Sequence, residues 1–218
     1  MMNIYIVRHG QTEFNRDYKM QGWLDSPLLP ESLDLAHQTG QGFKLDEIDF
    51  DKVYASDAPR AIITAENIIK GMEADFLVHQ EPLIKEMNFG QAEGRDIEMV
   101  WNRVAQQFGY KDRDDLYSQK DSSERLDLLH QNEDFNEAES LLEFHQRIAS
   151  GLANIVEASR NENHKNVLVV AHGLTILGLL KHAGWQDSAS MSFSNLSISI
   201  INASDEYAVK SVNKSYIE

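Results

Sequence analysis

The sequence predicts an α/β fold, a three-layer sandwich whose mostly parallel central sheet is flanked by helices and carries a helical cap insertion. Two observations predict the layers. Short apolar runs rich in β-branched residues recur along the chain, and longer segments with apolar residues at three- and four-residue spacing separate them. This alternation is typical of a sheet covered by helices on both faces. A third observation, a polar stretch in mid-chain, predicts the cap.

Six segments have the composition of strands. They are brief and continuously apolar, as parallel strands buried on both faces usually are. The expected strands are Asn3–Val7, Lys52–Ala55, Phe76–His79, Asn166–Ala171, Leu196–Asn202 and Tyr207–Val212.

Three segments between these strands have helical periodicity. Ala58–Lys70, Leu141–Ser159 and the stretch from Ile97 to Phe108 each place apolar residues on one side of a helix. Each is therefore expected to bury one face.

The segment Lys111–Glu137 is crowded with charged and polar residues and has few large apolar ones. It offers little apolar area to offset its ordering entropy, so we expect it to be solvated and partly mobile. No Pro/Gly-rich linker divides the chain. We therefore expect one domain over residues 1–218, with the cap insertion at approximately residues 96–140.

Composition excludes several classes of function. The 218 residues carry a formal net charge of −15, which disfavours nucleic acid or an anionic membrane as the main partner. The chain has no cysteine, so disulfides, zinc–thiolate sites and thiol chemistry are excluded. It lacks a secretory signal pattern and an apolar run of membrane-spanning length. We expect a cytoplasmic protein, and the sequence leaves a homodimer open.

Two apolar strands end in the same dipeptide. "IYIVRHG" ends at His9-Gly10 and "VLVVAHG" ends at His172-Gly173. Ligands of open α/β sheets bind outside the carboxyl ends of the strands, so both histidines should reach one edge. A third strand, "KVYAS", leads into "SDAPRA" and brings Arg60 to the same edge.

Two further residues complete this candidate site. Arg8 precedes the first histidine, and Glu86 lies in "LIKEMNFGQAEG" after another apolar segment. Gly10 and Gly173 would let backbone N–H groups approach an anion closely. The sequence thus predicts two histidines, two arginines and one carboxylate at one anion-binding edge.

Each residue also has a plain structural explanation. A lone histidine after a strand usually caps or hydrogen-bonds, Arg8 could form a surface ion pair, and Glu86 could be solvated. Arg60 near a helix start is unfavourable for the helix dipole, which favours a functional role. No ligand spacing indicates a metal site, and the arginines would repel a cation. We assign no role to the remaining histidines, His37, His79, His130, His145, His164 and His182.

Five motifs in order give the chain a resemblance to a known family. "RHGQTEFN", "QGWLDSPL", "SDAPRAIITAENI", "KEMNFGQAEG" and "VVAHG" resemble the histidine phosphatase superfamily, in its metal-independent, phosphoglycerate mutase-like branch. The resemblance spans most of the chain. It implies phosphoryl transfer through a phosphohistidine on a small phosphorylated substrate, with no metal and no cofactor.

The resemblance also implies roles for individual residues. His9 would be the nucleophile and would attack as a neutral imidazole, whereas His172 is more useful as a cation. Glu86 matches the proton donor. The residues that would hold the phosphoryl group are Arg8, Arg60 and His172, and those matching pocket-lining positions are Asn15, Gln21 and Gly22.

The chain departs from the family pattern in two places. In "SPLLPESLDLAHQTG", Leu29 replaces a helix-capping threonine and Ser32 replaces a glycine, which puts the start of that helix in question. The insertion is acidic, whereas mutases that handle a bisphosphorylated glycerate usually present more basic character there. Its scattered bases include Lys111, Arg113, Lys120 and Arg125.

Three functions remain open. The leading one is a phosphatase that hydrolyses small phosphomonoesters through phospho-His9. The alternative is a phosphoglycerate mutase that interconverts 2- and 3-phosphoglycerate with the same residues, and the acidic insertion favours hydrolysis. The third is a non-catalytic phospholigand-binding module, which would not need His9 and Glu86 beside the arginines.

Overall fold

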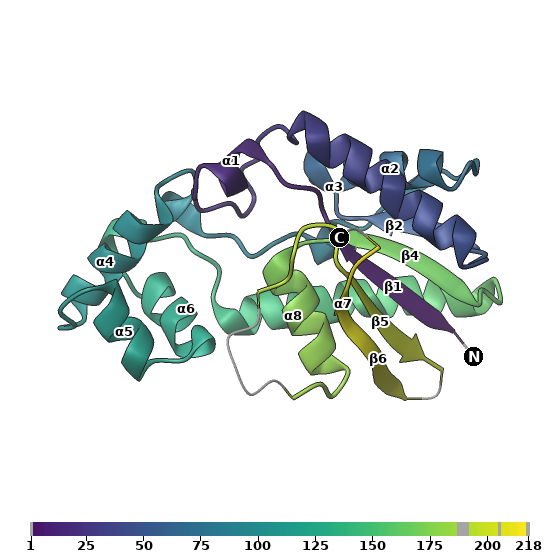
Figure 1. Ribbon diagram of the computed structural model, residues 1–218. Helices are drawn as coiled ribbons and strands as arrows, with labels where there is room; N and C mark the ends of the chain where they lie inside the picture. Colours follow the sequence, from purple (N-terminus) through teal and green to yellow (C-terminus); the bar gives the residue numbers. More distant parts are fainter. Residues whose placement is uncertain (1, 187–191, 205, 217–218) are drawn as a thin grey trace.

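A six-stranded sheet forms the centre of the computed structural model, which describes residues 2–186, 192–204 and 206–216 (Figure 1). The strand order is β3-β2-β4-β1-β5-β6. The first four strands in this order are parallel to one another. β5 runs antiparallel to both of its neighbours, β1 and β6. The strands are β1 (Asn3–Arg8), β2 (Lys52–Ala55), β3 (Val78–Gln80), β4 (Asn166–Ala171), β5 (Ile198–Ala203) and β6 (Tyr207–Lys214).

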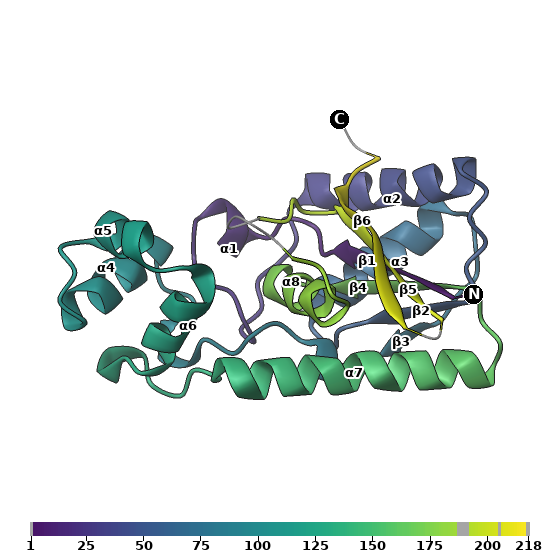
Figure 2. The ribbon, with the colours of Figure 1, turned by 90° about the horizontal axis from the view of Figure 1, so that it is seen from below.

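Helices cover both faces of this sheet, as the sequence predicts. On one face, α2 (Pro30–Leu45) and α3 (Pro59–Gly71) share a core with one side of β4. On the other, α7 (Leu141–Asn161) and α8 (Gly173–His182) share a core with the opposite side. Alternate residues of β4 enter these two cores because side chains of a strand alternate between faces. Figure 2 shows α2 and α7 on opposite sides of the sheet.

The register of the central strands brings the two His-Gly dipeptides together. β1 pairs with β4 in parallel, with Arg8 opposite Ala171. The N–H of His9 donates to the carbonyl of Ala171 at 2.9 Å. His9 and His172 therefore leave neighbouring strands at the same level.

All six predicted strands are present; β2 and β4 have the predicted ends, and the other four are shifted at one end or both. β3 begins at Val78 rather than Phe76, and β5 begins at Ile198 rather than Leu196. Leu196 has a φ of 61°, which takes it out of the extended conformation. β6 continues beyond Val212 to Lys214.

Neither α2 nor α8 is among the three helices that periodicity predicts. Leu29 caps α2 without a side-chain hydrogen bond, and Pro30 occupies the first helical position, where its missing N–H costs nothing. The helix therefore forms even though Leu29 replaces the threonine that would cap it. α8 is almost uniformly apolar, so it shows little periodicity.

A group of helices lies beyond the carboxyl end of β1 (Figures 1 and 2). It contains α4 (Ile97–Gln107), α5 (Arg113–Gln119) and α6 (Ser122–His130). The expectation of a largely solvated insertion is too simple, because Leu116 and Leu129 are fully buried. Its limits as a cap, and the single-domain organisation, stay predictions.

The remaining elements are short turns of helix. They lie in the connections between the longer elements. Within the described residues, no helix is long and apolar enough to cross a membrane. These elements are α1 (Glu13–Arg16), η1 (Pro82–Ile84), η2 (Gly90–Ala92) and η3 (Glu133–Phe135).

Candidate active site

The side chains predicted to form the site meet at the carboxyl edge of the sheet. The rings of His9 and His172 lie 5.1 Å apart between centroids. Arg60 projects from the first turn of α3, and Glu86 lies between η1 and η2. The histidines, Arg60 and Glu86 are all buried. Ionisable groups are seldom buried without partners or a function.

The environment of His9 fixes its reactive atom. Its Nδ1 lies 2.7 Å from the carbonyl oxygen of Gly10. A carbonyl only accepts, so Nδ1 carries the proton and Nε2 keeps its lone pair. Burial, together with the positive charges of Arg60 and Arg8, lowers the pKa of His9 well below 6.5. His9 is therefore a neutral imidazole with Nε2 free to act as a nucleophile.

His172 caps α8 and is held by Ser56. Its Nε2 lies 2.8 Å from the Ser56 hydroxyl oxygen, and its Nδ1 is buried without a hydrogen-bond partner. Burial, followed by the charge of Arg60, lowers the pKa of His172 well below 6.5. Burial and the neighbouring cations thus disfavour a charge on His172 in the unliganded protein, and the expectation that His172 acts as a cation toward a bound phosphoryl group stays a prediction.

The terminal nitrogen atoms of both arginine side chains donate hydrogen bonds to neighbouring residues. Arg60 donates from Nη1 to Asp25 Oδ1 at 2.7 Å and from Nη2 to the Gly22 carbonyl at 2.7 Å. Arg8 donates to the carbonyl of Phe193. The Nε atoms of both arginines are buried and, among the described residues, have no hydrogen-bond partner.

Unpartnered buried donors are costly and call for an explanation. The Nε atoms of Arg8 and Arg60 and Nδ1 of His172 belong to one site. Burial lowers the pKa of Arg8, and an anion beside it would compensate its charge. This group has the chemistry of an anion site.

Glu86 is bound to the start of α8. Its Oε2 accepts from the N–H of Leu174 and its Oε1 from the N–H of Thr175, both at 3.1 Å. Burial raises the pKa of Glu86, outweighing the opposing effects of the backbone donors at Leu174 and Met87 and of the charges of Arg60 and Arg8. A raised pKa is what a carboxylic acid needs to donate a proton near neutral pH.

The expected roles of the two glycines are only partly met. The N–H of Gly10 donates to the Thr64 hydroxyl at 3.0 Å, so the prediction that it serves an anion is not met. A Cβ at Gly173 would lie 3.7 Å from Arg8 Nε and 3.9 Å from Glu86 Oε2. Gly173 thus adjoins the charged groups.

The three predicted pocket-lining residues lie on one hydrogen-bonded segment, which contains α1 and the loop after it. The Thr12 hydroxyl lies 2.8 Å from Gln21 Oε1, and Asn15 closes a capping box with Thr12. A Cβ at Gly22 would lie 2.2 Å from the carbonyl oxygen of Met87, so only glycine fits. Gly22 also accepts from Arg60, which shows how this loop orients the arginine.

Sequence reasoning did not assign the residues that orient the site. Asp25 holds Arg60 and Ser56 holds His172, and both lie inside motifs that the sequence singles out. Asn195 donates to the His9 carbonyl at 2.9 Å, and no motif marks it. Among the described residues no group of three or more His, Asp or Glu side chains is placed to hold a metal ion.

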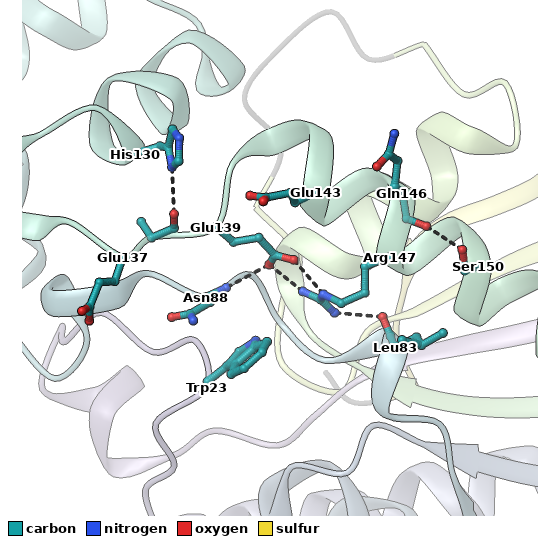
Figure 3. A pocket seen from close by; sticks show the side chains of 11 residues that line it. Trp23, Leu83, Asn88, His130, Glu137, Glu139, Glu143, Gln146, Arg147 and Ser150 are labelled. Carbon is teal, nitrogen blue, oxygen red and sulfur yellow. Dashed lines mark hydrogen bonds and ion pairs between the residues drawn. The ribbon is translucent and has the colours of Figure 1, made fainter.

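A pocket of about 720 Å³ lies beside the segment that carries Glu86 (Figure 3). Trp23 and Arg147 line it, and both donate hydrogen bonds to the Glu86 carbonyl, at 2.9 and 3.1 Å. His9, His172 and Glu86 are not among the residues that line it. This pocket therefore borders the main chain of Glu86.

Comparisons with known proteins agree with this geometry. Residues 4–214 match the model of a family described as the histidine phosphatase superfamily (branch 1). The chain is 30% identical over 188 residues to a probable phosphoglycerate mutase, GpmB, of Escherichia fergusonii, covering 82% of this chain and 76% of the relative.

Two solved structures extend the comparison. A phosphoglycerate mutase from Bacillus anthracis superimposes with a TM-score of 0.88 at 32% identity, covering 97% of this chain and 92% of the other. A phosphoserine phosphatase from Entamoeba histolytica, solved in complex with 3-phosphoglyceric acid, superimposes with a TM-score of 0.68 at 25% identity, covering 99% and 98%. Similar chains thus include both mutases and phosphatases.

Proposed function

This chain belongs to branch 1 of the histidine phosphatase superfamily, and from that premise we propose that it is a phosphatase hydrolysing small phosphomonoesters through phospho-His9. The observation that carries the proposal is the arrangement around His9. Its neutral ring has Nε2 free, lies 5.1 Å from the His172 ring and feels the charges of Arg60 and Arg8. A non-catalytic binding module would need no such nucleophile.

The first chemical step is transfer of the phosphoryl group to the protein. The guanidinium groups of Arg8 and Arg60, whose Nε atoms lack a partner among the described residues, neutralise the phosphate oxygens, with charge-assisted bonds that contribute on the order of 1.5–3 kcal/mol each. Nε2 of His9 attacks phosphorus in line as the bond to the leaving oxygen breaks. Glu86, whose pKa burial raises, acts from its protonated form and gives its proton to that oxygen. The products are the free alcohol and phospho-His9.

The second step releases the phosphoryl group to water. Glu86 is now a carboxylate and takes a proton from water as the water oxygen attacks phosphorus. The bond from Nε2 to phosphorus breaks, which restores neutral His9, protonated Glu86 and inorganic phosphate. A phosphoryl dianion beside His172 raises the pKa of that histidine, so His172 gains a proton and donates to the phosphoryl group when substrate is bound.

The alternative function is that of a phosphoglycerate mutase, and the mutase names of the relatives favour it. It needs cations for a second phosphate. In the group of helices beyond β1, however, Arg125 lies 3.9 Å and Arg113 5.8 Å from the centre of the Tyr117 ring. Arg113 also pairs with Asp114 at 3.0 Å, and Lys120 pairs with Glu124 at 2.8 Å. These bases are already engaged, which supports hydrolysis.

The remaining expectations concern partners and location. The formal charge of −15 supports a small phosphorylated substrate over nucleic acid or an anionic membrane. A homodimer and a location in the cytoplasm stay predictions from the sequence. Light scattering after size exclusion tests the first, and fractionation of cells tests the second.

A panel of phosphomonoesters, assayed on one preparation for phosphate release and for isomerisation of 3- to 2-phosphoglycerate, tests the proposal. We expect phosphate release from several monoesters and little stimulation of isomerisation by 2,3-bisphosphoglycerate. The Arg113→Ala variant serves as a control, because a second phosphate site would depend on it. Isomerisation that outruns hydrolysis by orders of magnitude and requires the bisphosphate would replace the phosphatase with the mutase.

A further inference from the structure

The guanidinium of Arg147, near the start of α7, uses all five of its N–H donors. Nε and Nη2 each donate to one carboxylate oxygen of Glu139 at 2.7 Å. Nη1 donates to the carbonyls of Leu83 and Lys85 at 2.8 and 2.9 Å, and Nη2 also donates to the carbonyl of Glu86 at 3.1 Å. Figure 3 shows the Arg147 guanidinium between the Glu139 carboxylate and Leu83.

These contacts hold a segment that lies outside the regular secondary structure. Glu86 lies between η1 and η2, outside every strand and long helix. Glu139 accepts from the N–H of Asn88 at 3.2 Å and donates its own N–H to the Asn88 carbonyl at 2.8 Å. The Arg147–Glu139 pair therefore fixes the chain on both sides of Glu86.

Glu86 is held from two directions. Arg147 and Trp23 hold its carbonyl, and the first turn of α8 holds its carboxyl group. A peptide that turned at Glu86 would pull the carboxyl group away from α8. Misplacement of a reacting group by about 1 Å can cost about 10²-fold in rate.

We propose that Arg147 is a positioning residue for catalysis, acting through the main chain of Glu86 to keep its carboxyl group aimed at the leaving oxygen. The proposal rests on the proposed role of Glu86 as the proton donor. Lysine is a poor substitute, because one ammonium cannot reproduce a planar fork that serves three carbonyls and a carboxylate together.

The pocket offers a direct way to test this role. Arg147 lines the open pocket of about 720 Å³ together with Trp23 and Glu139. Truncation to alanine would join the volume of the lost side chain to this pocket. A free guanidinium ion, which carries the same planar donors, could then reach Glu139 and the three carbonyls.

The experiment measures single-turnover phosphorylation of the Arg147→Ala protein with an alkyl phosphate and with an aryl phosphate. We expect a loss of about 10²-fold for the alkyl ester, whose leaving oxygen needs the proton, and a smaller loss for the aryl ester. Millimolar guanidinium should restore part of the alkyl rate, and methylammonium should not. The matched control is Arg160→Ala, because Arg160 lies on the same helix and donates to Ala203 and Ser204 far along the chain.

A second comparison separates positioning from mere stability. In a Glu86→Gln background, Arg147→Ala should slow the alkyl ester little further, since the group that it positions has already lost its proton. Thermal unfolding above the assay temperature confirms that each variant is folded, and Arg147→Lys replaces Arg147→Ala if the alanine variant unfolds, with the same selective loss expected. Equal losses for both esters without guanidinium rescue would overturn the proposal. Absence of phospho-His9 in the wild type would instead overturn the proposed function.

Discussion

At His9, one backbone carbonyl determines which ring nitrogen can attack. The Gly10 oxygen accepts a hydrogen bond from the Nδ1–H group, and burial of the ring, with the charges of Arg60 and Arg8, keeps it neutral by lowering its pKa. At Glu86 burial acts in the opposite sense and raises the pKa of the carboxyl group. The same low-dielectric environment thus lowers the pKa of the histidine and raises that of the carboxyl group, because burial disfavours the charged form of either group.

The Glu86→Gln variant tests whether Glu86 donates the proton to the leaving oxygen. It keeps the size of the side chain but removes the titratable proton, so we expect alkyl phosphates to react about 10²–10⁴-fold more slowly. Aryl phosphates should be affected less at the phosphorylation step, and phospho-His9 should accumulate because its hydrolysis loses the base. Rapid-quench rates for the two esters check this, and equal slowing would reduce Glu86 to a positioning residue.

The same residue predicts one limb of the pH profile. The acid acts in its protonated form, so phosphorylation with alkyl esters should decline as the pH rises through the pKa of Glu86, which burial shifts upward. Glu86→Gln should remove that decline. A profile that keeps this limb in the variant would assign the titration to another group.

The sequence predicts the reacting residues but not the residues that orient them. His9 and His172 stand out because each ends an apolar strand, and Arg60 and Glu86 lie in motifs after other apolar segments. Asn195 is 186 residues away from His9, and no local pattern connects them. The protonation state of His172 also depends on three-dimensional burial, which strand endings do not reveal.

At the scale of elements, α2 and α3 touch through glycine. A Cβ at Gly40 would lie 2.0 Å from the carbonyl oxygen of Ile68, and one at Gly71 would lie 1.9 Å from that of His37. Backbone therefore meets backbone at two points. This contact positions α3, whose first turn carries Arg60.

We expect Gly40→Ala to lower the free energy of unfolding by about 1–3 kcal/mol, the usual cost of overpacking. Alanine is the better helix former by about 0.5–1 kcal/mol, so a gain in stability would show that the helices separate easily. The control is Gln38→Ala, on the exposed side of the same helix. Urea denaturation of both variants measures the difference.

Periodicity finds elements with two distinct faces and misses the others. α3, α4 and α7 have a polar and an apolar side, and all three are predicted. α8 is buried on most sides and therefore lacks the contrast. In α5 and α6 the buried residues are few, among them Leu116, Leu126 and Leu129, too sparse for a clear pattern.

At the scale of the molecule, the sheet order explains why distant motifs form one site. β4 lies between β1 and β2, so the strands that end at Arg8, Ala55 and Ala171 are neighbours and run parallel. Their carboxyl ends face the group of helices formed by α4, α5 and α6 (Figure 2). Although the net charge is −15, Arg8 and Arg60 thus place two positive charges together at this edge.

The most direct test of the account is a rapid quench of the protein with a labelled phosphomonoester. We predict acid-labile, alkali-stable phosphate on His9, because its Nε2 is the free nucleophile of the site. The label should disappear in the His9→Ala variant and persist in Glu86→Gln. Labelling that survives the loss of His9, or turnover of the wild type without any phosphorylated protein, would contradict the account.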